Sequence, residues 1–136
     1  MYVVVIGCGR TGSKLAGLLS ERGHDVVIID KDAEQFTKLP ITFSGFKVEG
    51  DAFEQEILKS AKVEQADKVV ITTGSDKVNY MVTQLARFIF KVPEVLVRVI
   101  DPEKVKLFEK DPAVMTLSPL SLLVDEFASR VEGDEV

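Results

Sequence analysis

The stretch YVVVIGCGRTGSKLAGLL, residues 2–19, decides the fold class of this chain. It opens on a run of β-branched and aromatic residues, which is typical of a strand buried on both faces of a parallel sheet. The run stops at a glycine, and from Thr11 onward apolar residues recur at helical spacing. The stretch therefore predicts a strand joined to a helix by a glycine-rich turn, which is the opening unit of a parallel α/β fold.

The turn itself, GCGRTG, has the spacing G-x-G-x-x-G through Gly7, Gly9 and Gly12. Gly7 permits a sharp turn out of the strand, Gly9 lets a pyrophosphate approach the main chain, and Gly12 lets the helix pack close to the sheet. The helix that follows directs unpaired N–H groups and a partial positive charge at a ligand over the turn. Arg10 lies within the turn and either contacts phosphate or is a solvated loop residue.

An acidic residue, Asp30, stands at the end of the next apolar run, residues 26–29. In dinucleotide-binding units this position accepts hydrogen bonds from the adenosine ribose, and its carboxylate would repel a 2′-phosphate. We therefore expect NAD(H) or an adenine nucleotide rather than NADP. The alternative is that the glycines mark an ordinary tight turn and that Asp30 caps the following helix.

The same strand-then-helix pattern continues along the whole chain and favours an α/β, Rossmann-like, doubly wound parallel sheet of about six strands with helices on both faces. The predicted strands are 2–6, 26–29, 46–48, 68–73, 95–100 and 114–117. The predicted helices are 11–22, 32–39, 53–60, 77–90, one that begins at Pro102, and 120–131. We place a nucleotide-binding domain at 1–117 and a C-terminal helix and tail at 118–136, with residues 132–136 frayed.

Polar residues follow the third, fourth and fifth predicted strands, where a ligand of such a sheet would lie. Asp51 either accepts a hydrogen bond from an adenine amine or caps the next helix, and residues 72–74 bring hydroxyl and main-chain groups to the site. Asp76 either caps the following helix or contributes to the site. Asn79 and Arg98 are candidates for a polar rim.

Composition excludes several classes of function. The net charge of −5 opposes binding to a nucleic-acid backbone, and a single cysteine excludes an internal disulfide and cysteine-rich zinc sites. No apolar run reaches the length of a membrane-spanning helix, and no cleavable leader is apparent, so we expect a soluble intracellular protein.

Catalytic residues are also missing from the sequence pattern. The only histidine, His24, falls in a turn away from the glycine-rich turn, and Cys8 is expected to be a small packing residue rather than a nucleophile. No acid–base pair is apparent, and the chain leaves no room for a substrate domain. We expect no catalytic and no metal-binding residues.

The motifs taken in order resemble the N-terminal nucleotide-binding domain of Trk/Ktr potassium uptake regulators, called the TrkA-N, KTN or RCK-N domain. The resemblance covers about residues 1–130 and rests on VVVIGCGRTGSKLAGLLSERGHDVVIIDKD at 3–32, GDA at 50–52, ADKVVITTGSDKVNYMVTQLAR at 66–87 and VRVIDPE at 97–103. It implies a Rossmann fold that binds NAD(H), ATP, ADP or AMP and forms homodimers that can assemble into rings. It also implies gating of a membrane-embedded potassium transporter from its cytoplasmic side.

The resemblance also implies which residues contact the nucleotide. These are Gly7, Cys8, Gly9, Arg10, Thr11 and Gly12 in the phosphate loop, Asp30 and Lys31 at the ribose, Asp51 and Ala52 beside the adenine, and Thr73 and Gly74 after the fourth strand. The segment from Ser118 resembles the crossover helix of that family, which packs against a partner subunit. The alternative is that this helix closes the core of its own domain.

Three functions are consistent with the sequence. The first is a cytoplasmic, non-enzymatic regulatory subunit, held at the inner face of the cell membrane by its transporter. The second is a small NAD-dependent oxidoreductase or the cofactor domain of one, and the third is an adenylate sensor with no membrane partner. Many members of the family carry a further C-terminal domain, so the chain is either a stand-alone subunit or a shortened one.

Overall fold

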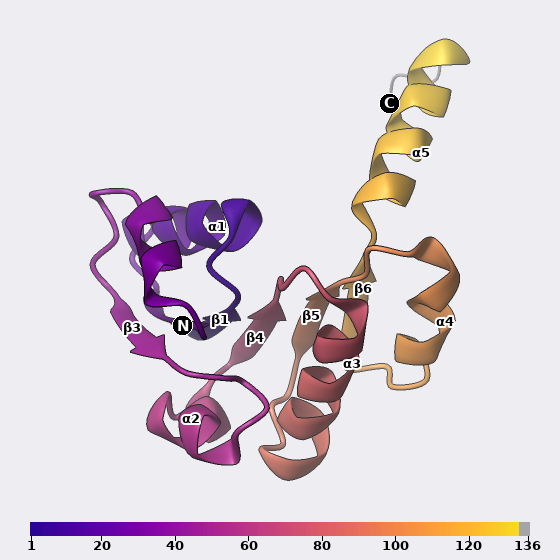
Figure 1. Cartoon of the computed structure of the whole chain (residues 1–136). Helices are drawn as coiled ribbons and strands as arrows, with labels where there is room; N and C mark the ends of the chain where they lie inside the picture. Colours follow the sequence, from indigo (N-terminus) through magenta and orange to yellow (C-terminus); the bar gives the residue numbers. More distant parts are fainter. Residues whose placement is uncertain (134–136) are drawn as a thin grey trace.

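The computed structural model describes residues 1–133, so the predicted fraying at 132–136 falls partly outside the described residues. Its centre is one sheet of six parallel strands in the order β3-β2-β1-β4-β5-β6 (Figure 1). The strands are β1 Tyr2–Ile6, β2 Asp25–Asp30, β3 Phe46–Glu49, β4 Lys68–Ile71, β5 Val95–Arg98 and β6 Val114–Leu117. The order reverses between β1 and β4, which confirms the doubly wound Rossmann-like fold.

Five α-helices and several shorter turns connect the strands. The α-helices are α1 Arg10–Glu21, α2 Gln55–Ser60, α3 Asp76–Gln84, α4 Val105–Phe108 and α5 Pro119–Val131. The shorter turns are the 3₁₀ helices η1 Ala33–Lys38, η2 Val63–Gln65 and η4 Pro102–Lys104, and the π-helical turn η3 Leu85–Ile89.

The core has two layers because alternate residues of each strand point to opposite faces of the sheet. Val3 and Val5 of β1 pack on one face with Ala16 of α1. Val4 and Ile6 pack on the other face, in the core that also holds Leu58 of α2 and Val82 of α3. The apolar run at the start of the sequence is therefore buried on both faces, as predicted.

Two predicted helices contain bonding other than that of an α-helix. Residues 32–39 were predicted to form a short helix, and they form the 3₁₀ helix η1, after which the N–H of Leu39 bonds to the carbonyl of Phe36 and Pro40 ends the turn. The helix predicted at 77–90 changes to π-type bonding after Gln84, and the N–H of Phe90 bonds to the carbonyl of Leu85.

The β6 edge of one sheet face and the last helix are not covered by other described residues. On the face that carries α1, exposure rises toward the β6 edge, where the Met115 side chain is 52% exposed and Leu117 is 40% exposed. Helix α5 projects away from the sheet (Figure 1) and has no buried residue. The alternative that α5 closes the core of its own domain is therefore wrong.

None of the described helices has the length and apolar character needed to cross a membrane.

Candidate nucleotide-binding site

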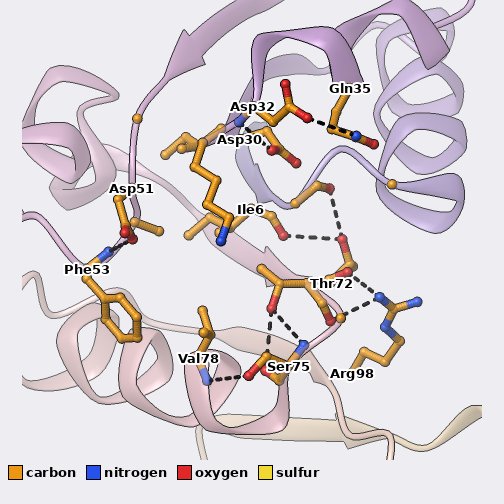
Figure 2. Close-up of a pocket in the computed structure, with 18 residues that line it drawn as sticks. Ile6, Asp30, Asp32, Gln35, Asp51, Phe53, Thr72, Ser75, Val78 and Arg98 are labelled. Carbon is orange, nitrogen blue, oxygen red and sulfur yellow. Dashed lines mark hydrogen bonds between the residues drawn. The ribbon is translucent and has the colours of Figure 1, made fainter.

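A cavity of about 550 Å³ lies at the carboxyl ends of the central strands, where a ligand of a doubly wound sheet is expected. Its wall is formed by residues at or after the carboxyl ends of β1, β2, β3, β4 and β5 (Figure 2). Among the residues predicted from the sequence, Gly7, Gly9, Asp30, Lys31, Asp51, Ala52, Thr73 and Gly74 line this cavity. Its volume falls within the usual range for small-molecule sites.

The structure explains the three glycines of the turn in different ways. Gly7 has a φ of +101°, a conformation that favours glycine. A Cβ at Gly12 would lie 1.8 Å from the carbonyl oxygen of Gly7, so glycine is needed there for α1 to pack against the turn. A Cβ at Gly9 would meet no atom within 4 Å. Neither φ nor packing requires glycine at position 9, and the space beside it opens onto the cavity.

Asp30 holds the main chain around the cavity. Its Oδ2 accepts a hydrogen bond from the N–H of Cys8 at 2.8 Å, and its Oδ1 accepts one from the N–H of Asp32 at 2.9 Å. A carboxylate has about four acceptor sites, so these bonds leave capacity for ligand hydroxyls. Asp30 therefore has a fixed position from which it faces the cavity.

Cys8 is a packing residue, as predicted. Its side chain is fully buried in the core layer beneath α1, and its Sγ donates to the carbonyl of Gln35 at 3.4 Å. Burial, with a further effect of the negative charge of Asp30, raises the pKa of the Cys8 thiol to about 11. The N–H of Cys8 is already bonded to Asp30, so neither group of this residue is directed at a ligand.

Four residues of the predicted phosphate loop do not line the cavity: Cys8, Arg10, Thr11 and Gly12. Arg10 begins α1 and its side chain is exposed. Thr11 is also exposed, in the first turn of the helix, and Gly12 is buried against Gly7. The structure thus separates the residues that face the cavity from those that shape it.

After β3, Asp51 organises its own turn. Its Oδ1 accepts a hydrogen bond from the N–H of Phe53 at 3.0 Å, while the helix that follows begins later, at Gln55. Asp51 therefore closes a turn rather than capping the helix directly, and it still faces the cavity. Phe53 and Gln35 also line the cavity and were not predicted, although the aromatic residue directly after GDA was a visible signal for Phe53.

After β4, Thr72 ties two strand ends together. Its hydroxyl bonds to the carbonyl oxygens of Ile6 at 3.2 Å and Gly7 at 3.0 Å, which fixes the glycine turn against β4. Asn79 is fully buried and donates to the carbonyls of Thr73 at 3.1 Å and Arg98 at 3.0 Å. Asn79 therefore supports the site from behind and does not form a polar rim.

Ser75 caps helix α3, whereas the sequence analysis considered Asp76 for this role. Ser75 accepts a hydrogen bond from the N–H of Val78 at 3.3 Å, so Ser75 and not Asp76 is the cap. The carboxylate of Asp76 instead accepts from the N–H groups of Ile100 at 2.7 Å and Asp101 at 2.9 Å. Asp76 thus joins the start of α3 to the chain that leaves β5.

Arg98, the last residue of β5, directs its guanidinium at the turn that follows β4 and begins with Thr72 (Figure 2). Its Nη2 donates to the carbonyls of Thr72 and Thr73, the latter at 3.0 Å, and its Nη1 donates to the hydroxyl of Thr11 at 3.4 Å. Its Nε is buried and has no hydrogen-bond partner among residues 1–133. Arg98 lines the cavity and is thus at its rim, where the sequence analysis placed it as a candidate.

Among the described residues, no group of three or more His, Cys, Asp or Glu side chains could hold a metal ion.

The fold order 3-2-1-4-5-6 and the glycine-rich β1–α1 turn define a Rossmann-type α/β domain. Within that class, residues 3–119 match the family described as the TrkA-N domain, and the chain belongs to this family. The resemblance drawn from the sequence motifs is therefore confirmed.

Curated relatives carry the same family name. The chain is 32% identical over 131 residues to a Trk system potassium uptake protein TrkA of Streptomyces coelicolor, covering 96% of this chain and 58% of that protein. It is 37% identical over 130 residues to TrkA of Mycobacterium tuberculosis, covering 93% of this chain and 59% of that protein. The chain thus spans less than two thirds of the length of these relatives.

Solved structures share the fold at lower identity. The TrkA-N domain of the inner membrane protein YbaL of Escherichia coli has a TM-score of 0.81 at 21% identity, covering 94% of each chain. The GsuK channel bound to NAD has a TM-score of 0.80 at 22% identity, covering 98% of this chain and 23% of that chain. The Kef C-terminal domain of Shewanella denitrificans in its AMP-bound form has a TM-score of 0.78 at 20% identity, covering 98% of this chain and 92% of that one.

Proposed function

We propose that this chain binds an adenine nucleotide, NAD(H), ATP, ADP or AMP, in the cavity beside Gly9 and acts as a nucleotide-sensing regulatory part of a potassium uptake system. The observation that carries the proposal is the open space beside Gly9, where neither a positive φ nor close packing requires a glycine. The names of the relatives support the potassium uptake role, and the nucleotides in the GsuK and Kef structures support the ligand class.

The proposed ligand is oriented by the groups that face the cavity. The ribose hydroxyls bind Asp30, with Lys31 beside it, and the adenine lies toward Asp51 and Ala52. The phosphates approach the main chain at Gly9, where the first N–H groups of α1 have no partner within the helix. The first turn of α1 contains no acidic residue, so an anion there meets no side-chain repulsion from that turn.

The chemistry of the cavity supports a binding role rather than catalysis. Asp30, Asp51 and Arg98 are all engaged in hydrogen bonds to the main chain, which is a positioning role. The thiol of Cys8 is buried and protonated at neutral pH, and the cavity lining contains no histidine. A nucleophile or a proton-transfer pair is therefore not assembled from the residues that line this cavity.

A second copy of the chain is the proposed partner of α5. The helix carries an exposed apolar stripe, formed by Leu120, Leu123, Val124, Phe127 and Val131, and the adjacent sheet face at Met115 is bare. A two-fold dimer in which each α5 packs on the other copy would cover both surfaces. Nucleotides with different affinities for two arrangements of such a dimer would shift their populations, and the transporter would respond to that shift.

The test is calorimetry of the whole chain with AMP, ADP, ATP and NADH. We expect binding by the unmodified chain and no binding by the Gly9→Val variant, because the added side chain fills the space that the phosphates need. Gly9→Ala is the graded control and should weaken binding less than valine. Thermal unfolding should show both variants folded, since the Cβ meets no protein atom. Normal binding by the valine variant would place the ligand elsewhere.

The ribose contact is tested in the same experiment by Asp30→Ala. We expect a loss of about 1 to 3 kcal/mol of binding free energy, because charge-assisted hydrogen bonds to the ribose disappear. Asp25→Ala is the matched control, since it removes the same charge from the exposed opposite end of β2. Unchanged affinity in Asp30→Ala, or steady NADH oxidation with a panel of carbonyl compounds, would contradict the proposal.

A further inference from the structure

Arg98 is a half-buried cation without a carboxylate partner among the described residues. The hydrogen bonds given for it go to neutral acceptors, the carbonyls of Thr72 and Thr73 and the hydroxyl of Thr11. By contrast Arg87, which has similar burial, forms an ion pair with Asp111 at 2.7 Å. Burying a charge without a counter-charge is costly, so the site of Arg98 favours the arrival of an anion.

The position of the guanidinium decides which anion it can meet. Asp30 and Arg98 end strands that are three sheet positions apart, so their main chains are separated by roughly 14 Å at the usual strand spacing. The Arg98 side chain bridges part of this distance and reaches Thr11 in the first turn of α1, at 3.4 Å. It therefore stands at the phosphate end of the proposed ligand site, on the side away from the ribose-binding Asp30.

The cavity thus has two electrostatic halves. Its β2–β3 side carries Asp30, Asp32 and Asp51 together with Lys31, and its β4–β5 side carries Arg98 as its one charged lining residue. Both N–H groups of Nη2 are bonded to the carbonyls of Thr72 and Thr73 and Nε is enclosed, so a ligand would meet Nη1, which has a second N–H beside the one bonded to Thr11. A guanidinium N–H forms a charge-assisted hydrogen bond with a phosphate oxygen.

We propose that Arg98 is the specificity-determining residue that binds a second phosphate, and so selects adenosine ligands with two linked phosphates over AMP. This inference rests on the proposed nucleotide binding. A nucleotide whose ribose is held at Asp30 places its first phosphate at Gly9 and α1, and its second phosphate then lies toward Arg98. AMP has no group that reaches this position.

The test compares AMP and ADP by calorimetry without divalent cations, using the whole chain. We expect ADP to bind more tightly than AMP, and Arg98→Gln to lower ADP affinity by about ten- to a hundredfold while changing AMP affinity by less than about threefold. Arg98→Lys keeps the charge but loses the planar fork, so its preference for ADP should be intermediate. Arg22→Gln is the control, because it removes one exposed positive charge at the far end of α1 and should leave the preference unchanged.

The results separate this inference from the proposed function. If Arg98→Gln weakens the binding of AMP and of ADP equally, Arg98 only supports the loop. If the variant keeps the preference for ADP over AMP, Arg98 does not contact the second phosphate. Either result overturns the inference while the proposed nucleotide binding stands. Absence of binding of both ligands to the unmodified chain would overturn the proposed function together with the inference. If thermal unfolding shows that the Arg98→Gln variant is unfolded, the inference is tested by comparing the AMP and ADP affinities of Arg98→Lys with those of the unmodified chain.

Discussion

At the scale of single residues, the site is built mainly by side chains that hold the main chain. Asp30 fixes the N–H groups of Cys8 and Asp32, and Thr72 fixes the carbonyls of Ile6 and Gly7. The glycine turn is therefore held in position from β2 and from β4. A ligand that binds there would meet a preorganised surface, which lowers the entropic cost of binding.

Cys8 provides a prediction at this scale. Its pKa of about 11 and its complete burial both keep the thiol protonated and shielded, so the folded chain should react with iodoacetamide very slowly at pH 8. The rate should approach that of a free thiol once the chain is unfolded in guanidinium chloride. Mass spectrometry of the labelled fraction over time measures both rates. Fast labelling of the folded chain at pH 8 would mean that the glycine turn opens.

At the scale of elements, the clearest stabilising ion pair joins η3, the π-helical turn after α3, to the loop before β6. Arg87 donates to the Asp111 carboxylate through Nε at 2.7 Å and through Nη2 at 3.3 Å, and also bonds to the carbonyl of Val92 at 2.6 Å. The hydrogen bond from Arg87, followed by one from the N–H of Ala113, lowers the pKa of Asp111 below its usual value. The charged form of Asp111 therefore stabilises the fold.

This ion pair predicts a pH-dependent stability difference. Asp111→Asn should lower the free energy of unfolding by about 1 to 2 kcal/mol at pH 7, because the charge-assisted bonds weaken while the bond to Ala113 is retained. A lowered folded pKa gives stability that is complete above the unfolded value and is lost as pH falls through the folded one. The difference from the unmodified chain should therefore shrink below about pH 4.

Urea unfolding at a series of pH values measures this difference. The control is Glu126→Gln, which removes an exposed pair with Arg130 on α5 and should change stability by less than about 0.5 kcal/mol. A difference between Asp111→Asn and the unmodified chain that stays constant from pH 7 to pH 3 would contradict the electrostatic explanation.

The sequence predicts the order and type of most elements because the apolar runs are long and their periods are distinct. Strand β1, apolar on both faces, and helix α5, with its stripe, were both placed correctly. The type of η1 was not predicted, because 3₁₀ and α-helical turns share the same short-range residue pattern. Arg98 was predicted only as a rim candidate, since its contacts join residues that are far apart in the chain, Thr11 and Thr73.

The sequence also predicts which strand ends form the cavity, but it does not predict which residues of each turn face it. The residues at the strand ends, such as Asp30 and Asp51, follow directly from the topology of a parallel sheet. Whether a residue faces the cavity or the core depends on the local path of the turn, which separates Gly9 from Cys8. The spacing of the glycines in the sequence does not determine the backbone path of the turn.

At the scale of the whole molecule, the apolar stripe of α5 predicts self-association. Phe127 is 61% exposed on a helix that contacts no core, so the Phe127→Lys variant should shift the chain from dimer to monomer at micromolar concentration. Asp125→Asn, on the same helix, is the control and should remain dimeric. Sedimentation equilibrium measures both masses. A monomeric unmodified chain at these concentrations would contradict the proposed dimer.

The strand order also has a consequence for how the chain emerges from a ribosome. Strand β1 pairs with β2 on one side but with β4 on the other, where Val3 lies opposite Lys68. Until the residues of β4 have been synthesised, the apolar strand β1 has an unsatisfied hydrogen-bonding edge, and parallel pairing between distant segments forms slowly. The period of translation between β2 and β4 is therefore when a nascent chain of this topology is most exposed to aggregation and most in need of a chaperone.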